Sequence, residues 1–473
     1  MTNSSADMAA GLIQPGRSLW RTEIADTVRL ALPIAFTQLG QVAMMTSDLV
    51  LVGRLGDRAV AAAALAQVVL YVGFMLGMGL VSAVAPLAAQ AFGAREPRMV
   101  RRALRVGLWA SLILGVPLLI VQLHGEGILL ALGQQPDIAH LAGEYLAGLA
   151  WSTVPAWWFI ALRSFMGAVN RPEPALWITL AAVPLNTLLA YALIFGAFGL
   201  PRLEMTGAGI ATTLVNAGMC IASFWVSYTQ PPFKKFRVLG NFYRADWPLM
   251  GRLIAVGAPI SGSFLLEYGL FASAALMVGW LGTAQLAAHQ IALQVAAIVF
   301  MVPLGISMAA TVRVGHAVGR VDSAATRRAG FAAIGLGAGF MATMVIVIVA
   351  LRHVIPLAFL DPGKSDADAT IALTATLLTI GSTFFIVDGV QTIAAGALRG
   401  LNDTRVPMVF AATSFWLVGF TACYVLGFSL GLGVIGIWMG FTGCLLLYAT
   451  LLTWRFDILT RRGYMPSIAH ASD

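Results

Sequence analysis

Three carboxylates, Asp48, Glu267 and Asp388, lie inside long stretches of uncharged, mostly apolar residues. An ionisable group in the hydrocarbon of a membrane costs several kcal/mol, and it is tolerated where it faces a bundle interior or a water-filled path. If Glu267 and Asp388 meet in one cavity, they cannot both stay ionised without a cation. Either a metal ion such as Na⁺ binds to both, or one of them holds a proton, and both arrangements make a coupling-ion site. The alternative is a pair of hydrogen-bonded acids that only stabilise helix packing.

Asp48 is expected to have polar neighbours on other apolar stretches, namely Asn186 and either Thr212 or Thr213. A carboxylate with amide and hydroxyl oxygens suits a hard cation or a proton relay. The competing interpretation is a polar clamp that holds the amino-terminal half together.

Several other side chains could face a substrate, and each has an ordinary structural explanation as well. His289 and Gln290 begin an apolar stretch, where a lone histidine is more often a hydrogen-bonded packing residue. Trp157 belongs to a tryptophan cluster that could stack on a substrate or anchor the chain at the membrane interface. The sequence contains no GxxxxGK[ST] loop, no HExxH motif and no Ser/His/Asp set, so we expect neither an ATP-driven protein nor an enzyme, and no cofactor.

Composition places these residues in a membrane protein. The chain has 473 residues, of which 59% are hydrophobic and 11% charged, and its mean hydropathy is +0.85. A membrane-spanning helix needs about 20 apolar residues, and the sequence predicts an all-α polytopic protein with spans at 26–52, 60–91, 103–121, 138–162, 174–197, 207–229, 248–280, 284–312, 329–350, 367–398, 406–428 and 434–456.

The distribution of positive charge predicts the orientation. With both termini in the cytoplasm, all but five of the 29 Lys and Arg residues fall on the cytoplasmic side, which is the bias expected of membrane proteins. The exceptions are Arg54, Arg58, Arg202, Arg352 and Lys364. The net charge of +8 is thus a topology signal, and nucleic acid is not an expected partner.

The two halves of the sequence resemble each other. At an offset of 226 residues Pro33 falls on Pro259, and at a later offset of 233 Pro174 falls on Pro407. Each half holds six spans, an even number, so the repeats are parallel, as in some transporters. We therefore predict an amino-terminal lobe (1–229), a basic cytoplasmic linker (230–246) and a carboxyl-terminal lobe (247–473).

The three acids are not shared between the repeats. Asp48 falls on an alanine and Asp388 on a proline, while Glu267 falls on Gln41. Because the common scaffold does not require them, their presence favours a function.

Four segments carry a family resemblance: LALPI…TSDLVLVGRLG, AAHQIALQVAAIVFMVPLGISMAATVRVGHAVG, VDGVQTIAAGALRGLNDTR and PLN in the fifth span. They resemble the multidrug and toxic compound extrusion (MATE) family, in its NorM branch, over nearly the whole chain. The resemblance implies a V-shaped, two-lobed antiporter that expels cationic, amphipathic compounds against inward Na⁺ or H⁺ flow. It implies cation binding by Glu267 and Asp388, and a polar site at Asp48 and Asn186.

Two positions depart from the family pattern, and they leave the identity of the coupling ion, Na⁺ or H⁺, undecided. Ala182 stands where NorM proteins often carry an asparagine, and Phe384 stands where a tyrosine can help to bind the cation. Both changes remove an oxygen ligand, while the overall likeness to NorM favours Na⁺. Candidates for the substrate cavity are Gln41, Trp157, His289, Gln290 and Phe384.

Other classes of protein remain as alternatives. A lipid-linked precursor flippase of similar fold would line its cavity with cationic side chains, whereas no Lys or Arg is expected in mid-span. The three acids are distributed unequally between the two lobes, and this fits a transporter that works by alternating access better than it fits a channel. We expect a monomer in the inner (cytoplasmic) membrane, with lipids and small cationic molecules as partners.

Overall fold

The computed structural model describes residues 17–240, 242–244, 246–360 and 367–465, and the regular structure within these ranges is helical. Eleven of the described helices are long and apolar enough to cross a membrane, and the bent pair α7–α8 makes a twelfth span. The predicted all-α, twelve-span architecture is confirmed.

The helices follow the expected spans closely. The amino-terminal half contains α2 (Arg17–Gly53), α3 (Asp57–Ser82), α4 (Val84–Gly93), α5 (Pro97–Leu123), α6 (Gly125–Ala131), α7 (Pro136–Ala150), α8 (Thr153–Ala168), α9 (Glu173–Phe195), η1 (Ala197–Gly199) and α10 (Glu204–Thr229). After η2 (Phe233–Phe236), the carboxyl-terminal half contains α11 (Trp247–Leu281), α12 (Thr283–Gly319), α13 (Ser323–Ala350), η3 (Ile355–Ala358), α14 (Ala367–Gly400), α15 (Arg405–Ala411), η4 (Ala412–Phe420), α16 (Thr421–Tyr424), η5 (Val425–Ser429) and α17 (Gly433–Arg461).

The fourth span is not the single helix that the sequence suggested. It divides into α7 and α8, which are bent by 46° at Trp151 and Ser152. Pro155 explains the break, because it has no N–H to donate to the carbonyl of Trp151 and its ring crowds that carbonyl. The corresponding span of the other half, α14, runs unbroken for 34 residues.

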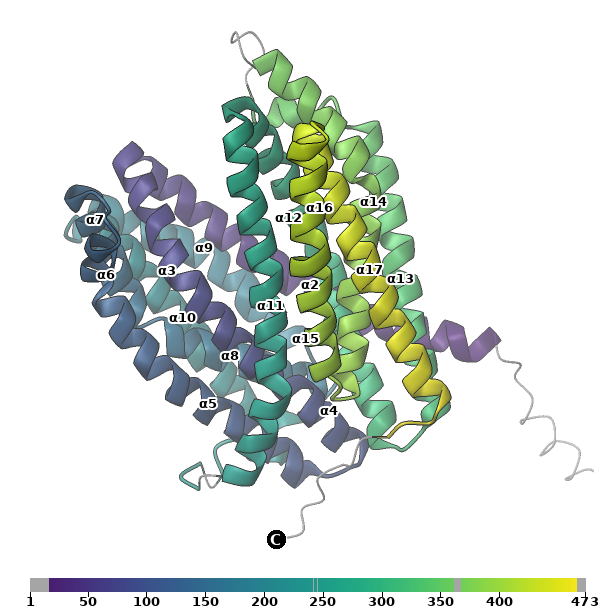
Figure 1. The fold of residues 1–473 in the computed structure, drawn as a ribbon. Coiled ribbons are helices and arrows are strands. Elements are labelled where there is room, and N and C mark those ends of the chain that lie inside the picture. The colour runs from purple at the N-terminus through teal and green to yellow at the C-terminus, as the bar shows by residue number, and fades with distance from the viewer. Residues whose placement is uncertain (1–16, 241, 245, 361–366, 466–473) are drawn as a thin grey trace, which may run out of the picture.

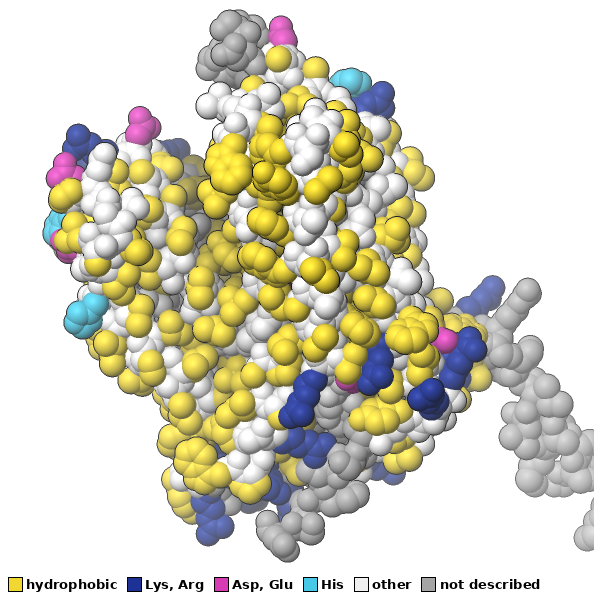
Figure 2. Space-filling view, viewed as in Figure 1, with side chains coloured by type: hydrophobic (Ala, Val, Ile, Leu, Met, Phe, Trp, Pro, Cys, Tyr) yellow, Lys and Arg dark blue, Asp and Glu magenta, His cyan; other side chains and the backbone are white. Residues whose placement is uncertain are grey.

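Two groups of helices form two lobes. Figure 1 shows α3 and α5–α10 on one side and α12–α17 on the other, spread apart at the top and in contact below. Helix α2 packs against α9 in its own half and against α12 and α13 in the other. Figure 2 shows a notch between the lobes at the upper end, and Lys and Arg side chains gathered at the lower end. The division at 229/230 and 246/247 stays a prediction.

Glycines bring the lobes into backbone contact at what we call the interlobe seam (Gly79, Gly93, Gly257, Gly305 and Gly319). A Cβ added to Gly305 would lie 2.8 Å from the Cα of Ala35, and one added to Gly319 would overlap the carbonyl oxygen of Gln90. Small residues permit such close approach of helices in a membrane.

Polar contacts reinforce the interlobe seam. The buried Gln90 side chain donates to the carbonyl of Gly400 (2.8 Å) and accepts from the Asn402 amide (2.8 Å). Nε2 of His316 lies 2.7 Å from the carbonyl oxygen of Ala168. The guanidinium of Arg313 pairs with Glu23, on α2, at 2.8 Å.

Replacing Gly319 by alanine is expected to force α12 away from α4, since its Cβ meets backbone rather than a movable side chain. Backbone amides of α4 should then exchange with deuterium at least several-fold faster, because the interlobe seam opens more often. Gly335→Ala in α13 is the matched control, since its Cβ meets nothing within 4 Å. Equal exchange in α4 for both variants would contradict this role of Gly319.

The linker is tied to the amino-terminal lobe at Asp246. Its carboxylate accepts from Nε of Arg102 (2.6 Å) and from the Leu249 amide (3.3 Å), and lies 3.5 Å from Nη2 of Arg105. Burial alone would raise the pKa of Asp246, but the Arg102 hydrogen bond and the other two partners outweigh it and hold that pKa below its ordinary value. Asp246 therefore stays ionised at neutral pH, as the cap of α11.

Candidate functional site

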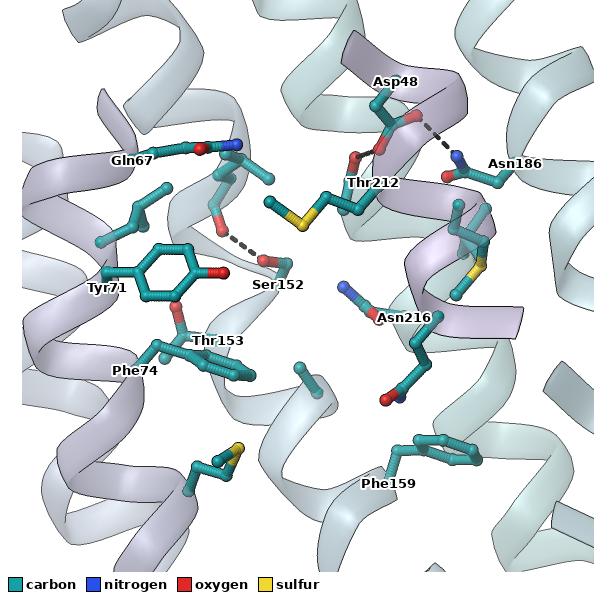
Figure 3. A pocket seen from close by; sticks show the side chains of 18 of the residues that line it. Asp48, Gln67, Tyr71, Phe74, Ser152, Thr153, Phe159, Asn186, Thr212 and Asn216 are labelled. Carbon is teal, nitrogen blue, oxygen red and sulfur yellow. Dashed lines mark hydrogen bonds between the residues drawn. The ribbon is translucent and has the colours of Figure 1, made fainter. Parts of the chain in front are cut away.

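The amino-terminal lobe contains a cavity of about 350 Å³. Its walls come from α2, α3, α5, α7, α8, α9 and α10, and they combine apolar side chains with a few polar ones. Figure 3 shows Gln67 and Tyr71 on one side, facing Asp48, Thr212 and Asn216 on the other. A concave, mostly apolar site of this volume with few polar groups is typical of small-molecule binding.

Asp48 is held by side chains from two other helices. Its Oδ1 accepts from Nδ2 of Asn186 in α9 (2.6 Å), and its Oδ2 accepts from the Thr212 hydroxyl in α10 (3.2 Å). Of the two threonines considered, Thr213 instead donates to the carbonyl of Gly148 (2.7 Å). The structure thus brings together Asp48, Asn186 and Thr212 at the wall of the cavity.

The carboxyl-terminal lobe brings Glu267 and Asp388 together through a third residue. Nε2 of Gln391 donates to Oε1 of Glu267 (3.1 Å) and to Oδ1 of Asp388 (3.1 Å). Asp388 and Gln391 are three residues apart on α14, so they share one helix face. Sequence reasoning missed Gln391, although this spacing was available as a signal.

A coupling ion would have to use these two acids with neutral oxygens. Across the described ranges, no three His, Cys, Asp or Glu side chains converge as a metal site. The carbonyl oxygen of the Gln391 side chain and the hydroxyl of Thr392, to which Nε2 of Gln391 also donates (3.0 Å), are the nearby neutral candidates. A proton needs no further ligand, since a carboxylic acid can donate to the neighbouring carboxylate.

Two arginines lie inside the ends of helices, although the sequence placed both just beyond the predicted spans. The span drawn to end at residue 162 continues as α8 to Ala168, so Arg163 lies within this helix, and it lines the amino-terminal cavity. Arg399 lies within α14, where it interacts electrostatically with Glu267 and stacks on the ring of Phe264 at 4.9 Å. Both arginines stand near a helix end, which is why the sequence placed them at a membrane surface.

The remaining candidates for the substrate cavity lie in three different environments: the cavity, the core and the surface. Gln41 lines the amino-terminal cavity, and its Oε1 accepts from Arg163 at 3.1 Å. Trp157 is fully buried against Gly77 instead. Gln290 is exposed on α12.

His289 and Phe384 lie in an aromatic cluster of the carboxyl-terminal lobe. Nδ1 of His289 accepts from the indole N–H of Trp438 (3.1 Å), and the imidazole is completely buried. Phe384 packs edge-on against Trp438, with ring centroids 5.3 Å apart, and is 1% exposed. In this conformation neither side chain is open to a substrate.

Comparisons with known proteins agree with this architecture. The family model MatE matches residues 33–192 and 259–425. These two segments begin and end at the same offsets at which the halves of the sequence align, which confirms the internal repeat.

Curated relatives cover the whole chain. It is 60% identical over 471 residues to a probable multidrug resistance protein NorM of Rhodopseudomonas palustris, covering 99% of each chain. It is 56% identical to a protein of the same description from Bradyrhizobium diazoefficiens, covering 93% of this chain and 94% of the relative. Among solved structures, the eukaryotic MATE transporter AtDTX14 matches with a TM-score of 0.82 at 19% identity, over 94% of this chain and 98% of that one.

Proposed function

The chain belongs to the MatE family, and on that premise we propose that it is a multidrug efflux antiporter of the inner membrane. It exports cationic, amphipathic compounds in exchange for Na⁺ or H⁺, works as a monomer among membrane lipids and needs no cofactor. The observation that carries the proposal is the pair of intramembrane acids, Glu267 and Asp388, bridged by the Gln391 amide. Such a pair binds a cation or a proton and releases it when its surroundings change.

The charges around these two acids support the exchange of one monovalent ion in each transport cycle. When both acids are ionised, the positive charge of Arg399 acts on Glu267 and offsets part of the negative charge of the pair. One Na⁺ or one H⁺ would then offset most of the negative charge that remains. The nearby Asp403 does not change this count, since it pairs with Arg455 at 2.8 Å.

The test uses purified protein in liposomes with trapped ethidium, whose export is followed by fluorescence. A Na⁺ gradient and a pH gradient are imposed separately, each with the other ion equal on both sides. One of the two gradients should accelerate export of the dye and the other should not. If neither gradient changes the rate, the antiport proposal is overturned.

A lipid-linked precursor flippase is the second candidate, and Arg163 is the observation in its favour. Its cavity would need several cationic side chains for an anionic headgroup. The described lining of the amino-terminal cavity offers one arginine, and Asp48 opposes it with a negative charge. The balance favours small-molecule export.

Orientation follows from the charge bias and has a direct test. Alkaline phosphatase fused after Arg202, on the η1–α10 connection, should be active, because this enzyme works outside the cytoplasm. The same enzyme fused after Arg237, in the linker, should be inactive, because the basic linker stays in the cytoplasm. Equal activity of the two fusions would contradict the twelve-span orientation. With this orientation, the interlobe seam closes the cytoplasmic end.

A further inference from the structure

A second hollow, of about 440 Å³, lies at the interlobe seam and shares no lining residue with the amino-terminal cavity. One wall comes from the amino-terminal lobe and consists of the end of α4, the start of α5 and Asn170, which follows α8. The other wall comes from α12, with Arg313, His316 and Arg320. We call this hollow the seam pocket. With the orientation proposed above, it lies at the cytoplasmic end of the protein.

The seam pocket exists only while the two lobes are in contact at this end. A Cβ added to Gly93 would overlap the carbonyl oxygen of His316. The rings of Phe92 and His316 have centroids 5.1 Å apart, and Nε2 of His316 lies 2.7 Å from the carbonyl oxygen of Ala168. If the seam opened, the two walls would separate. A ligand that touches both walls can therefore bind only to the closed seam.

Arginines from both lobes bring positive charge to the seam pocket. Arg95 follows α4 and Arg320 ends α12, and both side chains are exposed. Among the described residues, neither forms an ion pair with a carboxylate. Arg313 is already paired with two carboxylates of α2, and Glu96 is the one acid in the described lining. Arg95 and Arg320 therefore supply the positive charge that is available to a ligand.

The internal repeat does not require these two arginines. At the offset of 226 residues, Arg95 falls on Val321 and Arg320 falls on Ala94. Arg95 and Val321 have the same left-handed backbone, with φ of 61° and 57°, so the turn forms without an arginine in the other lobe. A cation at the end of a helix also complements the helix dipole. That role requires neither a hollow nor arginines from opposite lobes around it.

The groups around the seam pocket suit a phosphate. Guanidinium groups bind phosphate oxygens through paired N–H groups. Helix α5, which has 27 residues, begins at this pocket without a side-chain cap, and the amino-terminal end of a helix favours an anion. Basic pockets between helices on the cytoplasmic side of a membrane protein are a known kind of site for the phosphates of anionic lipids.

We propose that the seam pocket binds phosphate groups, which Arg95 and Arg320 hold from opposite lobes, and that the bound phosphate keeps the interlobe seam closed. The phosphates come either from cardiolipin, a lipid with two phosphates, or from a soluble phosphate compound of the cytoplasm. Because such a ligand binds only to the closed seam, it shifts the population of the protein toward the conformation described here. The inference concerns binding, so its test does not depend on the proposed export function.

The first experiment tests the shared chemistry with pyrophosphate, which carries two phosphates and no acyl chain. Purified full-length protein in nanodiscs of uncharged phosphatidylcholine is titrated with pyrophosphate in a calorimeter. Arg95→Gln and Arg320→Gln are each expected to weaken binding at least tenfold, as for loss of a charge-assisted hydrogen bond. The control is Arg462→Gln, which removes an exposed positive charge beyond α17 and outside the pocket, and it should change binding less than about twofold.

The second experiment distinguishes the two sources of phosphate. Native mass spectrometry counts the cardiolipin molecules that remain on wild-type protein, on the variant with both Arg95→Gln and Arg320→Gln, and on Arg462→Gln. Loss of a cardiolipin in the double variant alone would assign the pocket to the lipid. Equal retention in all three proteins, with weakened pyrophosphate binding in the double variant, would assign it to a soluble compound.

The third experiment tests whether the ligand holds the lobes together. Saturating pyrophosphate should slow hydrogen exchange of backbone amides at the ends of both α4 and α12 several-fold in the wild type, and it should have no such effect in the double variant. The melting temperature of each ligand-free variant is measured beside it as a test of folding. Arg320→Lys keeps the charge without the paired N–H groups, so it should retain part of the binding.

Four results would overturn the inference. Equal pyrophosphate affinity and equal cardiolipin retention in the wild type and the double variant would exclude the site. Equal weakening by Arg462→Gln would mean that only the net charge of this end matters. Slower exchange on one side alone would mean that the ligand does not join the lobes. A lower melting temperature with unchanged binding would mean that the arginines only complement helix ends. Absence of ethidium export with intact pyrophosphate binding would count against the proposed function alone.

Discussion

Glu267→Gln and Asp388→Asn are each expected to reduce ion-driven export at least tenfold, and the double variant should lose little more than either single one. Both acids accept from the same Gln391 amide, so removing one charge already empties the site. Non-additive losses are the signature of groups that act as one unit. Initial rates of ethidium export under the effective gradient measure the effect.

Arg399 sharpens this expectation. With one acid removed, the site carries one negative charge fewer and attracts the driving ion less, while the positive charge of Arg399, which acts on Glu267, stays nearby. A membrane potential contributes about 2.3 kcal/mol per charge per 100 mV only if a net charge moves with the cycle. The remaining transport of the single variants should therefore lose its dependence on membrane potential.

The control for the acid pair is Asp137→Asn, because Asp137 is an exposed acid at the start of α7 with a side chain 78% accessible. It should transport as wild type. Additive, independent losses for Glu267 and Asp388 would mean two separate sites, and wild-type rates in both single variants would refute the mechanism.

Asp48→Asn is expected to abolish export while leaving folded protein in the membrane. The asparagine is nearly the same size, so packing is preserved. The cavity, however, loses the negative charge of Asp48 and keeps the positive charge of Arg163. A cationic dye then meets a positive site. Export and dye binding are measured beside the amount of monodisperse protein after size-exclusion chromatography.

Two neighbouring threonines separate the effect of Asp48 from general damage to α10. Thr212→Val removes a hydrogen bond to Asp48 and should weaken export partially, by a few-fold. Thr213→Val is the matched control, since Thr213 contacts the carbonyl of Gly148 instead. A lower yield of folded protein without a specific transport defect would make Asp48 a structural clamp.

Hydropathy and the repeat were enough to predict the spans, because a run of about 20 consecutive apolar residues is typical of a membrane-spanning helix. They did not show the bend at Trp151 and Ser152, although Pro155 was a visible cause. They also could not show the π-helical segments Ala412–Phe420 and Val425–Ser429. Such segments are rare and have no simple sequence signal, and here α17 packs beside both of them.

The meeting of Asp48 with Asn186 was foreseeable because both are polar residues in spans of one lobe. The contact of Glu267 and Asp388 with Gln391 was harder to foresee. Gln391 is one of several polar residues of α14, and only the folded structure shows which of them meets the two acids. Arg163 was missed for a different reason. A charged residue near a helix end can point to the membrane surface or inward, and sequence alone does not decide between these directions.

The interlobe seam should also limit the leakage of ions through the protein. Where glycines meet the backbone of the other lobe, there is no side chain whose rotation could open a water-sized gap, and Gln90 adds buried hydrogen bonds across the seam. An antiporter, as proposed above, must not dissipate its driving gradient between transport cycles. A seam of this kind acts as an insulator, so the resting protein should conduct no measurable current between transport cycles.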